Sequence, residues 1–312
     1  CQDNSLCFVK YWRLWKKHWA VRNSYEVIVV GYPGHIVVPF AKFISKKKII
    51  ADALGSLYDA EINSHFPFFI KKIKSWLADW LMVKFADKIL LESNAQKKFF
   101  KKKFGKSDKY EVVYTGVDEI FNDKNIHKEH NKKLTVLFRG KLTPESGIIH
   151  ILKAAEILKE NKGISFRIIG SGYFLEKVNN FISEKKLANV ELVSRFLPTS
   201  ELIEEIRNAD LMLGQFEDNP RLNRAIPHKV FEAFAMGIPY LTGDALAIRE
   251  IVEDNISAFF VPLADPKALA SKIEFLSTQP VLLSKTAMRA KDIFEEKFGI
   301  TALVEKLLEI ML

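Results

Sequence analysis

The stretch RLNRAIPHKVFEAFAMGIPYLTGDALAIRE, residues 221–250, decides the fold of this chain. Residues 228–236 carry apolar side chains on one side of a short predicted helix, and Gly237 ends that helix. Residues 240–242 predict a strand, and a second helix is predicted from Ala247 onward. The stretch therefore predicts a loop–helix–strand–turn–helix unit.

Two charged residues stand early in the first of these helices. Lys229 lies near the helix N-terminus, where free backbone N–H groups and the helix dipole favour a phosphate. Glu232 follows about one turn later, and its carboxylate suits a pair of sugar hydroxyls. The two residue types together favour a ligand that carries both phosphate and sugar.

The composition bounds the class of protein. The 312 residues are enough for two domains, and 48% apolar with 27% charged residues is typical of soluble globular proteins. Residues 1–131 contain 23 Lys or Arg and 14 Asp or Glu, whereas residues 132–312 contain 24 of each, so the net charge of +9 lies in the first part. This asymmetry favours an anionic partner, a membrane or a nucleic acid, but a solvated lysine-rich surface explains it equally well.

Several other classes of site are excluded. Cys1 and Cys7 are the only cysteines, which excludes a disulfide framework and a cysteine-based zinc site and favours a reducing compartment. No run reaches the ~18 apolar residues of a membrane span, and no signal peptide is visible. The histidines are scattered and no DxD pair of carboxylates occurs, so we predict no metal site and no cofactor.

Residues 8–22 predict a helix with Trp12, Trp15 and Trp19 along one side. We favour the interpretation in which this stripe packs on a sheet. The alternative is an interfacial helix, with tryptophan at the headgroup level and cations toward anionic lipid.

The rest of the chain alternates strands and helices, which is typical of parallel sheets with helices on both faces. In the first part we predict strands at 26–30, 48–51, 89–91 and 110–114, helices at 37–46, 68–86 and 94–104, and a loop at 55–67. In the second part we predict strands at 134–138, 165–169, 190–193, 211–213 and 259–261, and helices at 148–160, 175–185, 200–208 (capped by Ser200), 266–278 and from 281 onward. The polar residues 122–133 predict a linker between domains 1–131 and 132–312, with the last helix packing back on the first domain.

Open parallel sheets bind ligands beyond the carboxyl ends of their strands. Arg139-Gly140-Lys141, followed by Gly147, forms either a phosphate-binding loop or an ordinary glycine turn. Gly170-x-Gly172 has Leu175 where a dinucleotide fingerprint needs a third glycine, which excludes a nicotinamide site. No Walker loop, nucleophile elbow or HExxH motif occurs. Five residues fall at predicted strand ends or on the helices that follow: Lys141, Gly172, Arg195, Lys229 and Glu232.

These motifs resemble those of the retaining glycosyltransferases of family 4, also called group 1. The family has the GT-B fold, an α/β architecture of two facing Rossmann-like, doubly wound parallel-sheet domains with the nucleotide-sugar site in the cleft. The matching segments of the second part are FRGKLTPESG (138–147), IIGSG (168–172), LMLGQF (211–216), residues 226–252 and FFVPLADPKALASKI (259–273). Looser matches in the first part are VIVVGYPGH (27–35), IIADALGSLYD (49–59), ADKILLES (86–93) and YTGVDEIF (114–121).

The resemblance implies roles for single residues. Glu232 matches the second acid of the E-x7-E motif, which holds the ribose hydroxyls of the donor, and Lys141 matches a basic residue that binds the diphosphate. Asp52 matches a position that faces the donor sugar. These three are the implied catalytic residues. The implied donor-binding residues are Gly140, Lys141, Gly147, Gly170, Gly172, Arg195, Arg224, His228, Lys229 and Glu232.

The chain departs from the family pattern at three places. Arg224 stands where the first acid of E-x7-E is expected, and Ser146 where a second basic residue is expected. We hypothesise that Lys229 or Arg224 supplies that missing charge. The family's N-terminal domain opens with a strand and a glycine-rich loop that have no counterpart before Glu26. Either the sequence is a fragment, or the protein is truncated and inactive.

The resemblance implies an enzyme of the hexosyltransferase type. It would move a sugar from a nucleotide-diphosphate donor to an envelope polysaccharide, lipid-linked or other glycan acceptor, with retention and without a metal. We expect a cytoplasmic protein with peripheral contact to the anionic inner membrane face and no nucleic-acid partner. The alternatives are a nucleotide-sugar epimerase of the GT-B fold and a truncated, non-catalytic nucleotide-sugar-binding protein.

Overall fold

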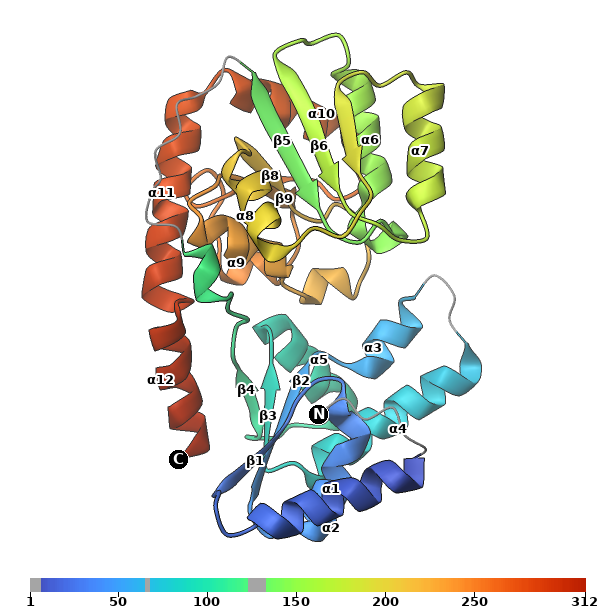
Figure 1. Ribbon diagram of the computed structural model, residues 1–312, viewed down its shortest axis with the longest axis vertical. Helices are drawn as coiled ribbons and strands as arrows, with labels where there is room; N and C mark the ends of the chain where they lie inside the picture. Colours follow the sequence, from blue (N-terminus) through green and yellow to red (C-terminus); the bar gives the residue numbers. More distant parts are fainter. Residues whose placement is uncertain (1–6, 65–67, 123–132) are drawn as a thin grey trace. The chain divides into compact units, whose positions relative to one another are not determined.

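The computed structural model describes residues 7–64, 68–122 and 133–312. The chain forms two compact units: the first unit contains residues 1–113 and 306–312, and the second unit contains residues 114–305 (Figure 1). Both are α/β units built on parallel sheets. The predicted domain boundary at 131/132 lies at the edge of residues 123–132, outside the described residues.

The first unit contains four parallel strands that are adjacent in chain order: β1 (Val27–Val30), β2 (Lys48–Leu54), β3 (Lys88–Leu91) and β4 (Tyr110–Val112). Crossovers between parallel neighbours are right-handed, so the connecting helices fall on one face. These helices are α2 (Val38–Ile44), α4 (Phe69–Phe85) and α5 (Asn94–Phe104). The strand residues alternate accordingly, because Ile49 and Ala51 pack toward this helical layer.

The other face of this sheet is covered by the last helix, α12 (Ile300–Met311). Ile50 and Leu90 form a small core with Ile310 there. The Lys48 ammonium also donates to the Ile310 carbonyl oxygen over 2.8 Å. Residues 306–312 are therefore part of the first unit.

The second unit contains six parallel strands in the order β10-β9-β8-β5-β6-β7. Their bounds are β5 (Leu134–Arg139), β6 (Ile164–Ile169), β7 (Val190–Val193), β8 (Leu211–Leu213), β9 (Tyr240–Gly243) and β10 (Phe259–Val261). The chain runs outward from β5 through β6 to β7, and then crosses to β8 on the other side of β5. The direction reverses between β5 and β8, and open α/β sheets bind their ligands at such a switch point.

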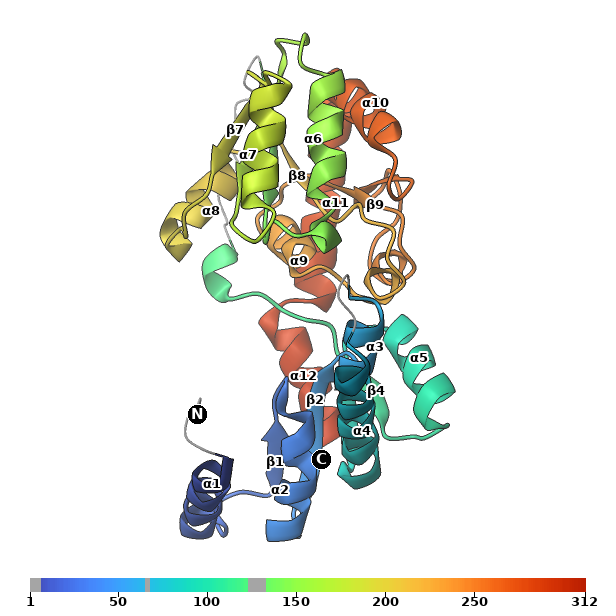
Figure 2. The ribbon, with the colours of Figure 1, turned by 90° about the vertical axis from the view of Figure 1, so that its right-hand side faces the viewer.

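Helices cover both faces of this second sheet (Figures 1 and 2). α6 (Ile148–Ile157), α7 (Leu175–Glu184) and α10 (Pro266–Ser277) share one core with the strands, in which Phe138, Phe166 and Leu152 are buried. α8 (Thr199–Arg207), α9 (His228–Ala235) and α11 (Pro280–Lys297) lie on the opposite face. The prediction of a doubly wound α/β fold is confirmed in this unit.

Three local predictions are wrong. The predicted loop 55–67 contains the helix α3 (Leu57–Ile62), because Ser56 Oγ accepts a hydrogen bond from the Asp59 amide and so caps a helix there. The helix predicted from Ala247 onward is only a 3-10 turn at 248–250. α8 begins at Thr199, one residue before the predicted cap Ser200.

The tryptophan stripe of α1 (Cys7–Val21) does not pack on a sheet. Trp12, Trp15 and Trp19 are 55%, 41% and 52% exposed, so the favoured interpretation of this helix is wrong. Within the described part of the chain, no helix has both the length and the apolarity needed to cross a bilayer.

Candidate functional site

Glycine loops pack closely at the carboxyl ends of the second unit's strands. A side chain at Gly170, after β6, would clash with the carbonyl oxygen of Gly140, after β5. Gly147 has a left-handed φ of 70°, and a Cβ there would lie 2.8 Å from the Glu217 amide nitrogen. Gly172 packs in the same way against the loop after β5. The structure thus packs Gly140, Gly170 and Gly172 together and places Gly147 against the loop after β8. Gly147, Gly170 and Gly172 stand at positions that leave no room for a side chain.

A buried ion pair lies at the switch point. Arg139, the last residue of β5, pairs with Glu232 of α9, whose side chain is 4% exposed. Glu232 Oε1 also lies 3.0 Å from His228 Nδ1 one helical turn earlier. The other oxygen, Oε2, is buried and has no hydrogen-bond partner among the residues that the structure describes. A buried acceptor left unsatisfied costs free energy, so this oxygen suits a ligand hydroxyl.

His228 connects this pair to the segment that enters the second unit. Its Nε2 lies 2.9 Å from the carbonyl oxygen of Gly116. Both neighbours of the ring are acceptors, so the imidazolium donates to both and the neutral ring to only one. Burial, and after it the charge of Arg139, lower the pKa of His228, whereas the bond to Gly116 raises it.

Lys229 places its ammonium beside the same loops. Nζ donates to the Gly214 carbonyl oxygen over 3.3 Å and lies 4.2 Å from the centre of the Phe138 ring. Burial, together with repulsion from Arg139, lowers the pKa of Lys229 to about 7. Arg139 and His228 therefore contact one carboxylate, Glu232, at the switch point, and Lys229 lies close enough to Arg139 to be repelled by it. We name Arg139, His228, Lys229 and Glu232 the switch-point cluster; its excess of positive charge suits an anion.

Three other predicted site residues of the second unit are not members of this cluster. Lys141 is exposed in the loop directly after Gly140, and Arg224 ends a 3-10 turn at 222–224. Arg195 follows the edge strand β7, two strands or about 10 Å from β5. It is exposed and its Nη1 donates to Glu201 over 2.9 Å, so the structure does not bring Arg195 to the cluster.

Asp52 belongs to the first unit. It lies within β2, which continues to Leu54 beyond the predicted strand end. Burial raises the pKa of the Asp52 carboxyl. The turn that follows is held by Asp79 of α4, which is fully buried and accepts hydrogen bonds from Ser56 Oγ at 2.6 Å and the Tyr58 amide at 3.0 Å.

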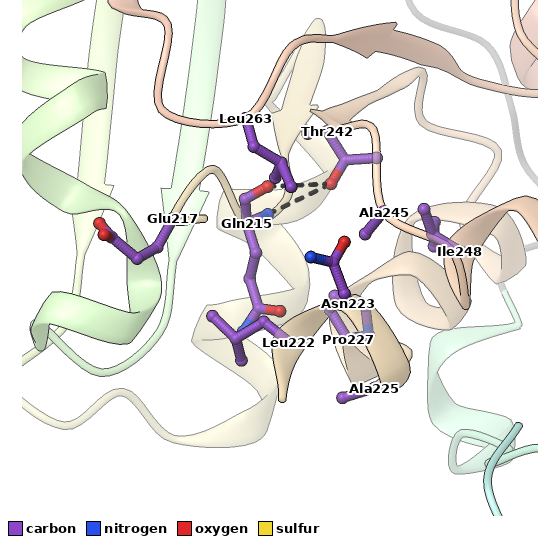
Figure 3. Close-up of a pocket in the computed structure, with 11 residues that line it drawn as sticks. Gln215, Glu217, Leu222, Asn223, Ala225, Pro227, Thr242, Ala245, Ile248 and Leu263 are labelled. Carbon is purple, nitrogen blue, oxygen red and sulfur yellow. Dashed lines mark hydrogen bonds between the residues drawn. The ribbon is translucent and has the colours of Figure 1, made fainter. Parts of the chain in front are cut away.

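A small pocket opens beside the switch-point cluster (Figure 3). Thr242 Oγ1 lies 3.3 Å from both the nitrogen and the carbonyl oxygen of Gln215, and Asn223, Ala245 and Ile248 are among the other lining residues. Its volume of about 10 Å³ is close to that of one water position. The pocket alone is therefore too small for a sugar.

Sequence reasoning missed the partner of Glu232. The sequence pattern indicates Arg139 only as part of a glycine loop, and the available signal for a further role is a charged residue at the end of a mostly apolar strand. His35 in the first unit was also missed; it is 1% exposed and its Nε2 lies 3.7 Å from Asp79 Oδ1. Among the described residues, no group of three His, Cys, Asp or Glu side chains is arranged to hold a metal ion.

A basic cluster lies beside glycine loops at the switch point of a doubly wound sheet, and such an arrangement suits a phosphorylated ligand. The chain belongs to the family "Glycosyl transferases group 1", whose family model matches residues 119–293. The matched segment contains all four members of the switch-point cluster.

Curated relatives agree with this assignment. The chain is 27% identical over 213 residues to the amylovoran biosynthesis glycosyltransferase AmsK of Erwinia amylovora, covering 66% of this chain and 51% of the relative. It is 28% identical over 203 residues to the putative colanic acid biosynthesis glycosyltransferase WcaL of Escherichia coli K12, covering 62% and 48%. The chain thus spans about half the length of these relatives.

The fold is that of GT-B glycosyltransferases, as predicted. Crystal structures of Anabaena Alr3699/HepE in complex with UDP and with UDP-glucose superimpose with a TM-score of 0.77. Each superposition covers 96% of this chain and 80% of the Anabaena chain, and the sequence identity is 16%.

Proposed function

We propose that this protein transfers a sugar from a nucleotide-diphosphate sugar to a glycan acceptor of an envelope polysaccharide, polymeric or lipid-linked, with retention and without a metal. The switch-point cluster is the observation that carries the proposal. The names of AmsK and WcaL, which concern amylovoran and colanic acid, support the acceptor class. The complexes of the Anabaena protein with UDP and UDP-glucose support the donor class.

The donor would be held by three features of the second unit. Glu232 accepts hydrogen bonds from the ribose hydroxyls through its unsatisfied Oε2, while Arg139 fixes the carboxylate from the other side. The diphosphate lies by the glycine loops, where Lys229 and Lys141 provide positive charge. Arg195 and Arg224 remain predicted donor contacts.

The proposed chemistry is electrostatic. Breaking the bond between the sugar and the diphosphate develops negative charge on the leaving diphosphate, and fixed cations lower the barrier most where charge develops. Lys141 and Lys229 are the cations proposed for this role. Asp52 is the first unit's candidate for a contact to the transferred sugar.

Titration calorimetry with UDP and GDP, followed by a transfer assay with the sugar nucleotide of the preferred base, tests this proposal. We expect one of the two nucleotides to bind, transfer to persist in EDTA, and Lys141→Ala to raise the donor KM by about tenfold or more, the loss of one charge-assisted contact. Lys285→Ala, which removes an exposed lysine of α11, is the matched control and should leave the KM unchanged.

Three outcomes would contradict the proposal. Absence of nucleotide binding removes its basis. Binding without turnover favours a non-catalytic nucleotide-sugar-binding protein. Conversion of the donor to its epimer without acceptor favours an epimerase.

A further inference from the structure

All tryptophans of the chain lie on two helices of the first unit, and all are exposed. Trp12, Trp15 and Trp19 belong to α1, and Trp76 and Trp80 of α4 are 40% and 37% exposed. Neighbouring indoles stack on one another, with ring centres 5.9 Å apart for Trp15–Trp19 and 6.3 Å for Trp76–Trp80. Tryptophan is highly buried on average, so this concentration at the surface of one unit indicates a partner.

α4 turns its apolar stripe away from the core. Phe69, Ile73, Trp76 and Trp80 follow the spacing i, i+4, i+7, i+11 of one helix face and are 74%, 52%, 40% and 37% exposed. The opposite face, with Met82, is the buried one. A surface helix normally has the reverse arrangement, polar outward and apolar inward.

Cations flank both stripes. Lys84 Nζ lies 5.0 Å from the Trp80 ring centre, and Lys16 Nζ lies 3.7 Å from that of Trp12. The only acid of α4, Asp79, is buried, and α1 contains none. The neighbouring helix α5 adds five lysines between Lys97 and Lys103 and no acid.

The two helices belong to one layer of the first unit. α1 contacts α2 through Tyr11 and Phe40, whose ring centres are 4.8 Å apart, and α2 in turn contacts α4. In Figure 2, α2 lies between α1 and α4 in the lower part of the picture. Phe43 of α2, 88% exposed, adds a further large apolar side chain to this layer.

We propose that the exposed faces of α1 and α4, which we name the Trp–Lys surface, bind an anionic phospholipid membrane. Tryptophan partitions to the headgroup level, and lysine is attracted by anionic lipid, so a helix with both lies in the plane of the interface. A second copy of the chain is disfavoured as the partner, because two identical basic surfaces repel each other. Delivery of the enzyme to a lipid-linked acceptor rests on the proposed function; membrane binding itself does not.

The inference is tested by vesicle binding in the absence of donor and acceptor. A protein that does not bind vesicles would therefore contradict membrane binding but not the proposed transfer reaction. The full protein is mixed with phosphatidylglycerol or phosphatidylcholine vesicles, and sedimentation and tryptophan emission are measured. We expect binding to the anionic vesicles only, weakened by salt, with a blue shift of the emission. The emission is a direct report, because the chain has no tryptophan outside the two helices.

Matched variants separate insertion from simple charge attraction. Trp76→Ala/Trp80→Ala should lower partitioning to anionic vesicles by about tenfold. Lys71 and Lys74 are exposed lysines of α4, and the double change Lys71→Glu/Lys74→Glu, which reverses their charge, should abolish binding. Phe275→Ala, which removes an exposed aromatic side chain of α10 in the second unit, should have no effect.

Several results would overturn the assignment. One is binding of the Trp76→Ala/Trp80→Ala protein equal to that of the wild type. Another is a dimer, seen by light scattering, that this variant disrupts. A third is binding to a DNA or RNA oligonucleotide in place of vesicles.

Discussion

The two units place their cations in opposite surroundings. In the second unit Arg139 pairs with the buried Glu232, and Lys229 donates to the Gly214 carbonyl oxygen. In the first unit most lysines of α4 and α5 are exposed to water. A buried cation is little screened by salt and must be compensated by a specific partner. Exposed cations act through their summed charge, which salt screens. The second unit is therefore suited to one defined anion, and the first to an extended anionic surface.

The largest effect on stability is expected when buried Arg139 loses its partner carboxylate. Glu232→Ala removes the partner of Arg139 and should lower the free energy of unfolding of the second unit by about 3–5 kcal/mol. Urea unfolding followed by circular dichroism measures this loss. Tryptophan fluorescence follows only the first unit, because all tryptophans lie in α1 and α4, and its transition should not shift.

The control for this change is an exposed pair. Glu201→Ala removes the partner of Arg195 and should cost less than about 1 kcal/mol. Equal losses for the two variants would show that burial does not distinguish the two ion pairs, and the contrast drawn above would fail.

A smaller effect is expected from pH. The pKa of Lys229 is lowered to about 7, so its side chain is charged below that pH and neutral above it. An anionic donor binds the charged form more tightly, so donor affinity should fall above pH 7, by at most about tenfold per pH unit. Calorimetry with an intact sugar nucleotide measures this, because its diphosphate does not titrate in the range.

Two lysine variants sharpen this test. Lys229→Met should weaken donor binding at pH 6 and remove the fall above pH 7. Lys141→Met should weaken binding but keep the fall, since Lys141 is exposed. A pH dependence that survives in Lys229→Met would assign it to another group.

The smallest effect on stability is expected at the exposed cations. Lys101→Ala/Lys102→Ala/Lys103→Ala in α5 should change the free energy of unfolding by no more than about 0.5 kcal/mol per residue. The same variant should weaken binding to anionic vesicles and reduce its salt dependence. A large loss of stability would mean that these lysines make structural contacts beyond that of Lys103, whose Nζ lies 5.7 Å from the centre of the Tyr58 ring.

Much of the second unit could be predicted because its signals are local. The glycines of the βα loops and the apolar runs of the strands each report on their own segment, and the structure confirms the strands 190–193, 211–213 and 259–261 at their predicted bounds. The sequence marks Arg139 as a charged residue at a strand end but does not identify Glu232 as its partner, because the pair joins a strand to a helix far along the chain and depends on the strand order.

The first unit shows a second limit of sequence reasoning. Periodicity correctly predicts a tryptophan stripe on α1. The same spacing is found in stripes that pack on a sheet and in stripes that face water, so it does not predict the side to which the stripe is turned. Which side faces the core depends on the neighbouring elements. The helix α3 was missed for a similar reason, since the buried Asp79 that accepts hydrogen bonds from its first turn belongs to the following helix.

Because α12 covers its sheet, the first unit can finish folding only after the last helix has been synthesised. Ile50 and Leu90 are covered by Ile310, so one face of that sheet stays bare while the ribosome translates the whole second unit. The second unit is continuous from 114 to 305 and can fold as it emerges. The earlier-made unit thus reaches its final form last. Until then its apolar face is exposed to solvent, which makes such a folding intermediate prone to aggregate.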